Sequence, residues 1–183
     1  MSTVYTIGHS THPKEEFEAL LKQHDIKMLV DVRSIPGSSH NPQFGKGVFQ
    51  QWIEHSGILY VHMPEIGGRR KAQDADPMVN AGWRLKSFHN YADYTLTDEY
   101  IEGIRKLEAL AKVMTTVFVC SEAMPWRCHR HLIADTLTYR GWDVQHIYPN
   151  GNLETHKLGT GGAVPHEDRA RGRLIYPPEG VLI

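Results

Sequence analysis

Short apolar runs alternate along the chain with segments whose apolar residues recur at helical spacing. The runs are rich in β-branched residues and end at polar or turn-forming residues, which is typical of strands. They are Val4–Gly8, Lys27–Val32, Ile58–Met63, Thr116–Cys120 and Asp143–Ile147. Helices are predicted after Pro13, over Val48–His55, after the N-cap residue Thr97 and from Pro125 or Trp126 onward.

Strands that alternate with helices favour right-handed crossovers and a parallel sheet covered on both faces. The predicted fold is therefore a single three-layer α/β/α domain with a mostly parallel, Rossmann-like sheet. We place this domain in residues 1–150. Residues 151–183 form a Gly- and Pro-rich tail, which either wraps over the domain or is partly disordered.

Composition narrows the class of protein. The 183 residues carry 20 basic and 21 acidic side chains, so the net charge is -1, and nucleic acid is not the favoured partner. Two cysteines cannot build a disulfide framework, and the start MSTVYTIGHS lacks the pattern of a signal peptide. No apolar run approaches the roughly 20 residues that span a membrane. We expect a cytoplasmic protein without a membrane partner, and the oligomeric state stays open.

Segments with polar and charged side chains follow each of the first four predicted strands. In open parallel sheets, ligands bind outside the carboxyl ends of the strands, so these segments are expected to meet at one edge. They are Gly8–Thr11, Asp31–Ser34, His62–Arg70 and Cys120–Arg130. This convergence predicts a site at that edge of the sheet.

The only two cysteines stand at the two ends of one of these segments. If the helix begins at Pro125 or Trp126, Cys128 lies in its first turn, where the helix dipole and nearby arginines favour a thiolate. Cys120 ends a buried strand and has no such help. The alternative interpretation is a structural thiol, since free cysteine is usually buried. That alternative is the simpler one for Cys120, and both interpretations stay open for Cys128.

Five motifs resemble signature segments of the domain of unknown function 488 family of bacteria and archaea. They are TIGHST, DVRSIP, YVHMPEIGGRR, FHNYADYTLT and CSEAMPWRCHRHLIAD, and they occur in family order over about Val4 to Ile147. The resemblance implies an α/β domain. It brings no established activity, although some relatives are connected with DNA repair.

Three chemistries remain open for the predicted site. The first uses Cys128 as an activated thiolate. The second is a Zn or Fe site built from Cys, His and Glu ligands. The third is acid–base chemistry by Glu122 and His9 on a small anionic, phosphorylated or nucleotide-like ligand, which arginines clamp and which the Gly67-Gly68 backbone approaches closely.

We therefore expect an enzyme with Cys128, Glu122 and His9 as its catalytic groups. The residues predicted to bind the ligand are Ser10, Asp31, Arg33, His62, Arg69, Arg70, Cys120, His129 and Arg130. The alternative from another class is a non-catalytic module for nucleotide or nucleic acid. In that case the tail arginines Arg169, Arg171 and Arg173 would extend its positive surface.

Overall fold

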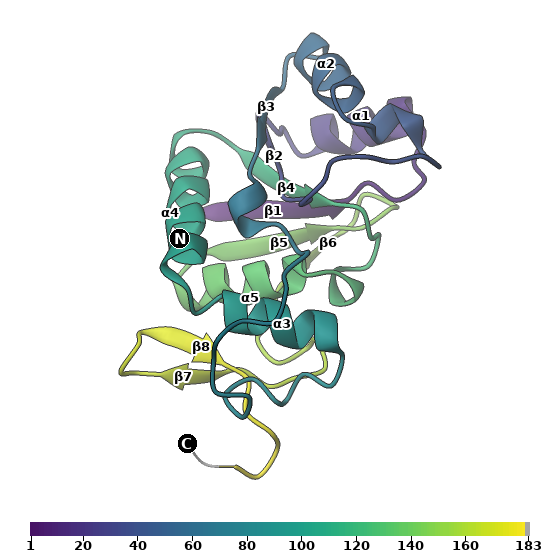
Figure 1. Cartoon of the computed structure of the whole chain (residues 1–183). Coiled ribbons are helices and arrows are strands. Elements are labelled where there is room, and N and C mark those ends of the chain that lie inside the picture. The colour runs from purple at the N-terminus through teal and green to yellow at the C-terminus, as the bar shows by residue number, and fades with distance from the viewer. Residues whose placement is uncertain (182–183) are drawn as a thin grey trace.

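The predicted strands form one sheet in the computed structural model, which describes residues 1–181. The five predicted strands are β1 (Thr3–Gly8), β2 (Met28–Asp31), β3 (Leu59–His62), β4 (Thr116–Cys120) and β5 (Asp143–Ile147). A sixth strand, β6 (Leu153–Thr155), joins the sheet from the predicted tail. Their order is β3-β2-β4-β1-β5-β6, and only β6 runs antiparallel to its neighbour (Figure 1).

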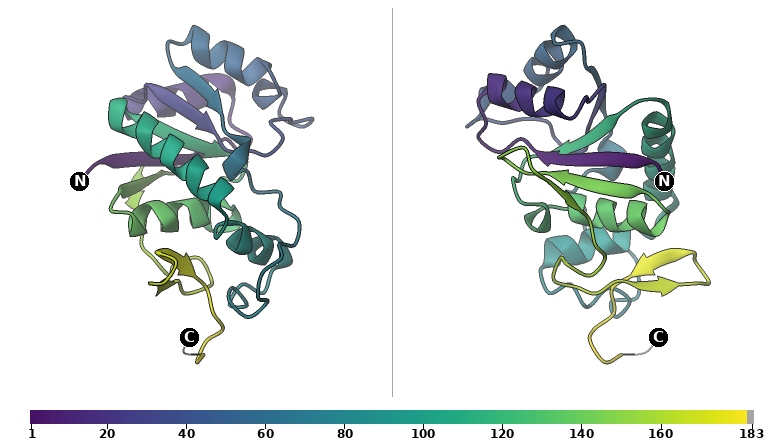
Figure 2. Two further views of the ribbon diagram at one scale, coloured as in Figure 1. Left: turned by 60° about the vertical axis from the view of Figure 1, so that its left-hand side comes forward. Right: turned by 180° about the vertical axis from the view of Figure 1, so that it is seen from behind.

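Helices cover both faces of this sheet, so the predicted three-layer fold is confirmed (Figure 2). They are α1 (Lys14–Gln23), α2 (Val48–His55), α3 (Lys86–Tyr94), α4 (Asp98–Val113) and α5 (Arg130–Tyr139). Helices α1 and α2 pack on one face, and α4 and α5 pack on the other, with α3 on their side. Within residues 1–181, no helix has the length and apolar character that a membrane crossing requires.

The central strands are apolar throughout because each alternate side chain enters a different core. Leu29 of β2 and Val117 of β4 pack against α1 and α2, whereas Val30 and Phe118 pack against α4 and α5. All four side chains are fully buried. This is the expected pattern of a parallel strand covered on both faces.

Helix α5 begins later than predicted. Residues Pro125–Arg127 form a separate 3₁₀ turn, in which the Cys128 N–H bonds to the Pro125 carbonyl, and α5 starts only at Arg130. Cys128 between them is extended, with φ -134° and ψ 148°. The prediction that Cys128 lies in the first helical turn is therefore wrong. The extended backbone allows Cys128 to reach Cys120, which a continuous helix would not.

The predicted tail follows the surface from the sheet edge to α5. After β6 it forms a hairpin of β7 (His166–Asp168) and β8 (Arg173–Ile175), which lies beside α5 (Figure 1). The Tyr176 N–H donates to Asn80 Oδ1 at 2.9 Å, which joins the tail to the segment before α3. Residues 182–183 of the predicted tail lie outside the described residues.

Candidate functional site at the carboxyl edge of the sheet

A pocket of about 580 Å³ opens at the carboxyl ends of β1, β2 and β4. The neighbouring strands β1 and β4 continue into α1 and α5 on opposite faces of the sheet, which makes this edge a topological switch point. Two backbone bonds join the loops that follow these strands. The His9 N–H donates to the Cys120 carbonyl at 2.8 Å, and the Ser10 N–H donates to the Ser121 carbonyl at 2.9 Å.

The pocket collects most of the predicted site residues. Those that line it are His9, Ser10, Arg33, Arg69, Cys120, Glu122, Cys128 and His129. The predicted residues outside its lining are Asp31, His62, Arg70 and Arg130. Arg127, which was not among the predicted ligand-binding residues, also lines the pocket and is exposed.

Cys120 and Cys128 form a disulfide in the wall of the pocket. Each residue is only 4% exposed, so the pocket is their route to solvent. Neither cysteine is a free thiol in this state. Cys120 is bonded to Cys128 and is therefore part of the same site, not only a buried residue at the end of a strand. The expected lone thiolate at Cys128 is thus replaced by a pair of sulfurs.

The imidazole of His129 faces both sulfurs. Its Nδ1 lies 3.5 Å from Cys128 Sγ and 3.9 Å from Cys120 Sγ. Its Nε2 lies 3.1 Å from the Val32 carbonyl, and because a carbonyl only accepts, the proton belongs on Nε2 and Nδ1 presents a lone pair to the sulfurs. Burial lowers the pKa of His129 to about 4, so the ring is neutral at neutral pH.

The Gly67-Gly68 pair has a packing role here. A Cβ on Gly68 would come within 2.3 Å of His129 Nδ1, and a Cβ on Gly67 would come within 2.5 Å of Ser34 Oγ. The two glycines therefore let the backbone approach these side chains. Gly68 also lines the pocket, so the expected close approach of a ligand to this backbone stays a prediction.

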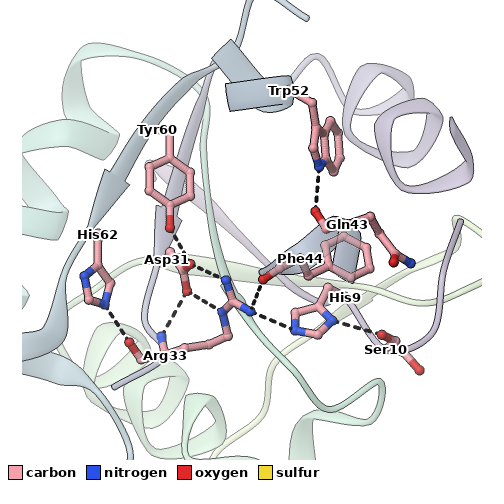
Figure 3. Close-up of polar contacts among 9 residues, drawn as sticks. All are labelled: His9, Ser10, Asp31, Arg33, Gln43, Phe44, Trp52, Tyr60 and His62. Atoms are coloured by element: carbon pink, nitrogen blue, oxygen red, sulfur yellow. Dashed lines mark hydrogen bonds and ion pairs between the residues drawn. The ribbon is translucent and has the colours of Figure 1, made fainter. Parts of the chain in front are cut away.

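Asp31 and Arg33, of which Arg33 lines the pocket, form a buried ion pair (Figure 3). Arg33 Nε donates to Asp31 Oδ1 at 2.9 Å, and its Nη2 donates to Oδ2 at 2.7 Å. Arg33 Nη1 donates to the Phe44 carbonyl at 2.8 Å, and Tyr60 donates its hydroxyl hydrogen to Asp31 Oδ2 at 2.5 Å. The Arg33 guanidinium donates its hydrogen bonds to these protein groups and so orders the pocket wall. It was expected to bind an anionic ligand instead.

His9 is also fully engaged by the protein (Figure 3). Its Nδ1 donates to the Ser10 carbonyl at 2.9 Å, and its Nε2 accepts from Arg33 Nη1 at 3.3 Å. The ring stacks on Phe44, and burial, aided by the Arg33 charge, lowers the pKa of His9 to about 4. Neither nitrogen is left for the proton transfer expected of His9. His62 likewise supports the site from outside, because its Nε2 donates to the Arg33 carbonyl at 2.7 Å.

Two of the predicted anion-binding arginines hold loops instead. Arg130 is fully buried and donates through Nη2 to the carbonyls of Glu122 and Ala123, each at 2.8 Å. Arg70 lies 3.8 Å from the Tyr94 ring centroid and donates to the Gly67 carbonyl at 3.0 Å. The four-arginine clamp therefore does not assemble. The pocket keeps Arg69 and Arg127 as its exposed cations.

The tail arginines do not form an uncompensated positive surface. Each of them contacts a carboxylate: Arg169 contacts Glu167, Arg171 contacts Asp168, and Arg173 contacts Asp98. The structure thus gives no support to a nucleic-acid surface built on these three residues.

Three of the side chains expected to supply metal ligands come together. The expected set is Cys120, Glu122, Cys128, His129, His9 and His62. The sulfurs of Cys120 and Cys128 and a ring nitrogen of His129 all lie within 4.8 Å of one another. His9 and His62 use their nitrogens for the contacts described above. A metal site at this edge would therefore rest on two thiolates and one imidazole, and would require the reduced protein.

The family model described as domain of unknown function DUF488 matches residues 13–137. The chain therefore belongs to this family, as its motifs predicted. Neither a curated protein nor a solved structure matches the chain.

Proposed function

We propose that this member of the DUF488 family is a thiol–disulfide enzyme that acts on a small anionic substrate in the edge pocket. One observation carries the proposal: the Cys120–Cys128 pair lines the pocket, with the unprotonated Nδ1 of His129 within 3.9 Å of both sulfurs. Catalytic cysteines need such a proton acceptor beside them. A disulfide in a reducing compartment is, moreover, usually transient and catalytic.

The reaction begins from the reduced pair. Cys128 passes its proton to His129 Nδ1, the nearer acceptor at 3.5 Å, and its thiolate attacks one sulfur of a substrate disulfide. The substrate S–S bond breaks, and the first thiolate leaves with the proton that His129 returns. Cys120 then passes its own proton to His129 Nδ1 and attacks Cys128 Sγ, which closes the protein disulfide. The second substrate thiolate leaves and takes that proton from His129. Two electrons pass from the protein dithiol to the substrate disulfide.

The pocket suits a small anionic disulfide. Its volume of about 580 Å³ lies within the usual range for small-molecule sites, roughly 300–1,000 Å³. Arg69 and Arg127 are exposed on its wall and can pair with carboxylate or phosphate groups. Glu122 is the carboxylate among the residues that line the pocket wall, and we keep it as a candidate acid–base group for the bound substrate.

The test uses the reduced protein with glutathione disulfide, which is anionic, and with cystamine, a cationic disulfide. We expect Cys128 to react faster than free cysteine at neutral pH, and glutathione disulfide to be favoured over cystamine. In Cys120→Ser the mixed disulfide on Cys128 should accumulate, as seen by intact mass, because the resolving thiol is missing. Cys128→Ser should form no mixed disulfide. If Cys120→Ser reacts no faster than free cysteine, the proposal fails.

A second candidate follows from the same three side chains. In the reduced state, Cys120, Cys128 and His129 offer the soft and borderline donors that Zn prefers. Elemental analysis of protein purified under reducing conditions distinguishes the two. About one equivalent of Zn that blocks the reaction with disulfides, and that is lost in Cys120→Ser, would favour the metal site over the redox enzyme.

A further inference from the structure

A second cluster of ligating side chains lies under the C-terminal segment, away from the pocket lining. His131 and Asp135 stand four residues apart on α5, and His156 follows β6. One ligand atom from each lies within 4.8 Å of the other two, and all three residues are buried. His156 Nε2 is 2.7 Å from Asp135 Oδ1, and His131 Nε2 is 3.9 Å from the same oxygen.

His131 Nε2 is the unexplained atom of this cluster. His131 is only 3% exposed, and within residues 1–181 its Nε2 has no hydrogen-bond partner. Buried polar atoms without a partner are rare, since each costs about 1–3 kcal/mol. Gly161 covers the ring, because a Cβ there would come within 2.1 Å of Nε2. The nitrogen is thus held in place beside Asp135 without a protein group to satisfy it.

The surroundings match the outer shell of a metal site. Asp135 Oδ2 accepts the Tyr176 hydroxyl hydrogen at 2.7 Å, and His156 Nδ1 lies 2.9 Å from His146 Nε2. His146 Nδ1 in turn lies 3.3 Å from Thr6 Oγ1. Ligating histidines and carboxylates are oriented by such partners. A tautomer change along His156 and His146 frees His156 Nε2 as a ligand and leaves its Nδ1 donating to His146.

We propose that His131, Asp135 and His156 bind one divalent transition-metal ion that fastens the C-terminal segment to α5. Two imidazoles and one carboxylate select Zn²⁺ or a similar borderline ion over Mg²⁺ or Ca²⁺. Zn–N bonds of about 2.0–2.1 Å place tetrahedral donors roughly 3.3 Å apart. The two separations from Asp135 Oδ1, 2.7 and 3.9 Å, lie on either side of that value, and all three ligand atoms lie within 4.8 Å of one another. Water takes the fourth position.

The experiment first removes the two cysteines, so that Zn²⁺ cannot bind at the Cys120–Cys128–His129 group. In the full-length Cys120→Ser/Cys128→Ser protein, stripped with a chelator, Zn²⁺ titration by calorimetry should show about one ion per chain. His131→Leu in this background should abolish the binding. His131→Phe, which keeps the shape of the ring, provides a second variant should Leu fail to fold. His55→Ala removes an exposed histidine far from the cluster and should bind Zn²⁺ like its parent.

Two further readouts separate a metal site from a packing role. Tyr176→Phe keeps the ligands and removes one outer-shell bond, so Zn²⁺ affinity should fall by about 10-fold or more. Zn²⁺ should also slow hydrogen exchange in residues 151–181 of the parent Cys120→Ser/Cys128→Ser protein. The exchange rates of the same residues in the His131→Phe variant should not respond to Zn²⁺. The proposal is overturned if the folded parent takes up no Zn²⁺ at micromolar concentrations, or if the His131 variants bind it with the affinity of the parent.

Discussion

Arg33 and Asp31 meet through two parallel hydrogen bonds, of 2.9 and 2.7 Å, at the carboxyl end of β2. Asp31 is 0% and Arg33 is 6% exposed, so the pair is shielded from solvent. The third guanidinium nitrogen reaches the Phe44 carbonyl and His9, which ties the pair to the wall of the pocket. The shape of the candidate site therefore depends on the ion pair between the buried Arg33 guanidinium and the Asp31 carboxylate.

Asp31→Asn should strongly destabilise the protein. The substitution keeps the side-chain shape but leaves the buried Arg33 guanidinium without its counter-charge, which typically costs about 3–5 kcal/mol. Urea unfolding followed by circular dichroism measures the free energy of unfolding. Asp25→Asn, which changes an exposed carboxylate paired with Lys27, is the control and should change little. Equal losses in the two variants would contradict the role given to the pair.

Reduction of the Cys120–Cys128 disulfide should lower the stability by a moderate amount. The bridge closes a loop with a sequence separation of 8 residues, and it removes conformational entropy worth about 2.5 kcal/mol from the unfolded chain. Urea unfolding with and without dithiothreitol measures the difference. The Cys120→Ser/Cys128→Ser protein is the control, and its stability should not respond to the reductant. A wild-type protein equally indifferent to reductant would contradict the prediction.

The fold was predictable because its signals are local. Continuous β-branched runs and an N-cap at Thr97, whose Oγ1 accepts from the Tyr100 N–H, depend only on neighbouring residues. The start of α5 was missed because Pro125 opens a 3₁₀ turn as readily as an α-helix. The 3₁₀ turn is favoured by the bond between Cys128 and Cys120. This is a tertiary contact, which the local sequence does not reveal.

The roles of charged residues at the site were harder to foresee. An arginine in a sequence is normally exposed, yet Arg130 is fully buried and holds the loop between the cysteines. The spacing of His131 and Asp135 was a readable signal, since residues four apart share a helix face. Their third partner, His156, comes from the tail after β6 and is brought there only by the folded chain.

Gly8→Ala should disturb the contact between the two loops of the pocket. A Cβ on Gly8 would lie 1.7 Å from the Glu122 carbonyl oxygen, and the backbone must separate to admit it. Such overpacking costs about 1–3 kcal/mol, and the shift should also slow disulfide formation between the cysteines. Gly37→Ala is the matched control, because no atom lies within 4 Å of its added Cβ. Thermal unfolding and the rate of thiol oxidation check both effects.

Buried histidines should make the protein acid-sensitive. Burial lowers the pKa of His9 and of His129 to about 4, and lowers that of His146 to about 2, from the ordinary value of 6.5. Between pH 6.5 and 4 these histidines are therefore protonated in the unfolded chain and neutral in the folded chain. The free energy of unfolding must rise with pH across this window and fall as the solution is acidified.

Each of these histidines should contribute up to about 1.4 kcal/mol of stability per pH unit between pH 6.5 and its folded pKa. Urea unfolding at intervals from pH 7.5 to 4.5 gives the slope, and hence the number of protons taken up on unfolding. His9→Asn should reduce that uptake by up to one proton, because the buried ring at this position is gone. His55→Ala, at an exposed histidine, is the matched control for the loss of one imidazole. A stability that stays level between pH 6.5 and 4.5 would show that the rings of His9 and His129 accept protons in the folded protein, and that the lone pair of His129 is not reserved for the sulfurs.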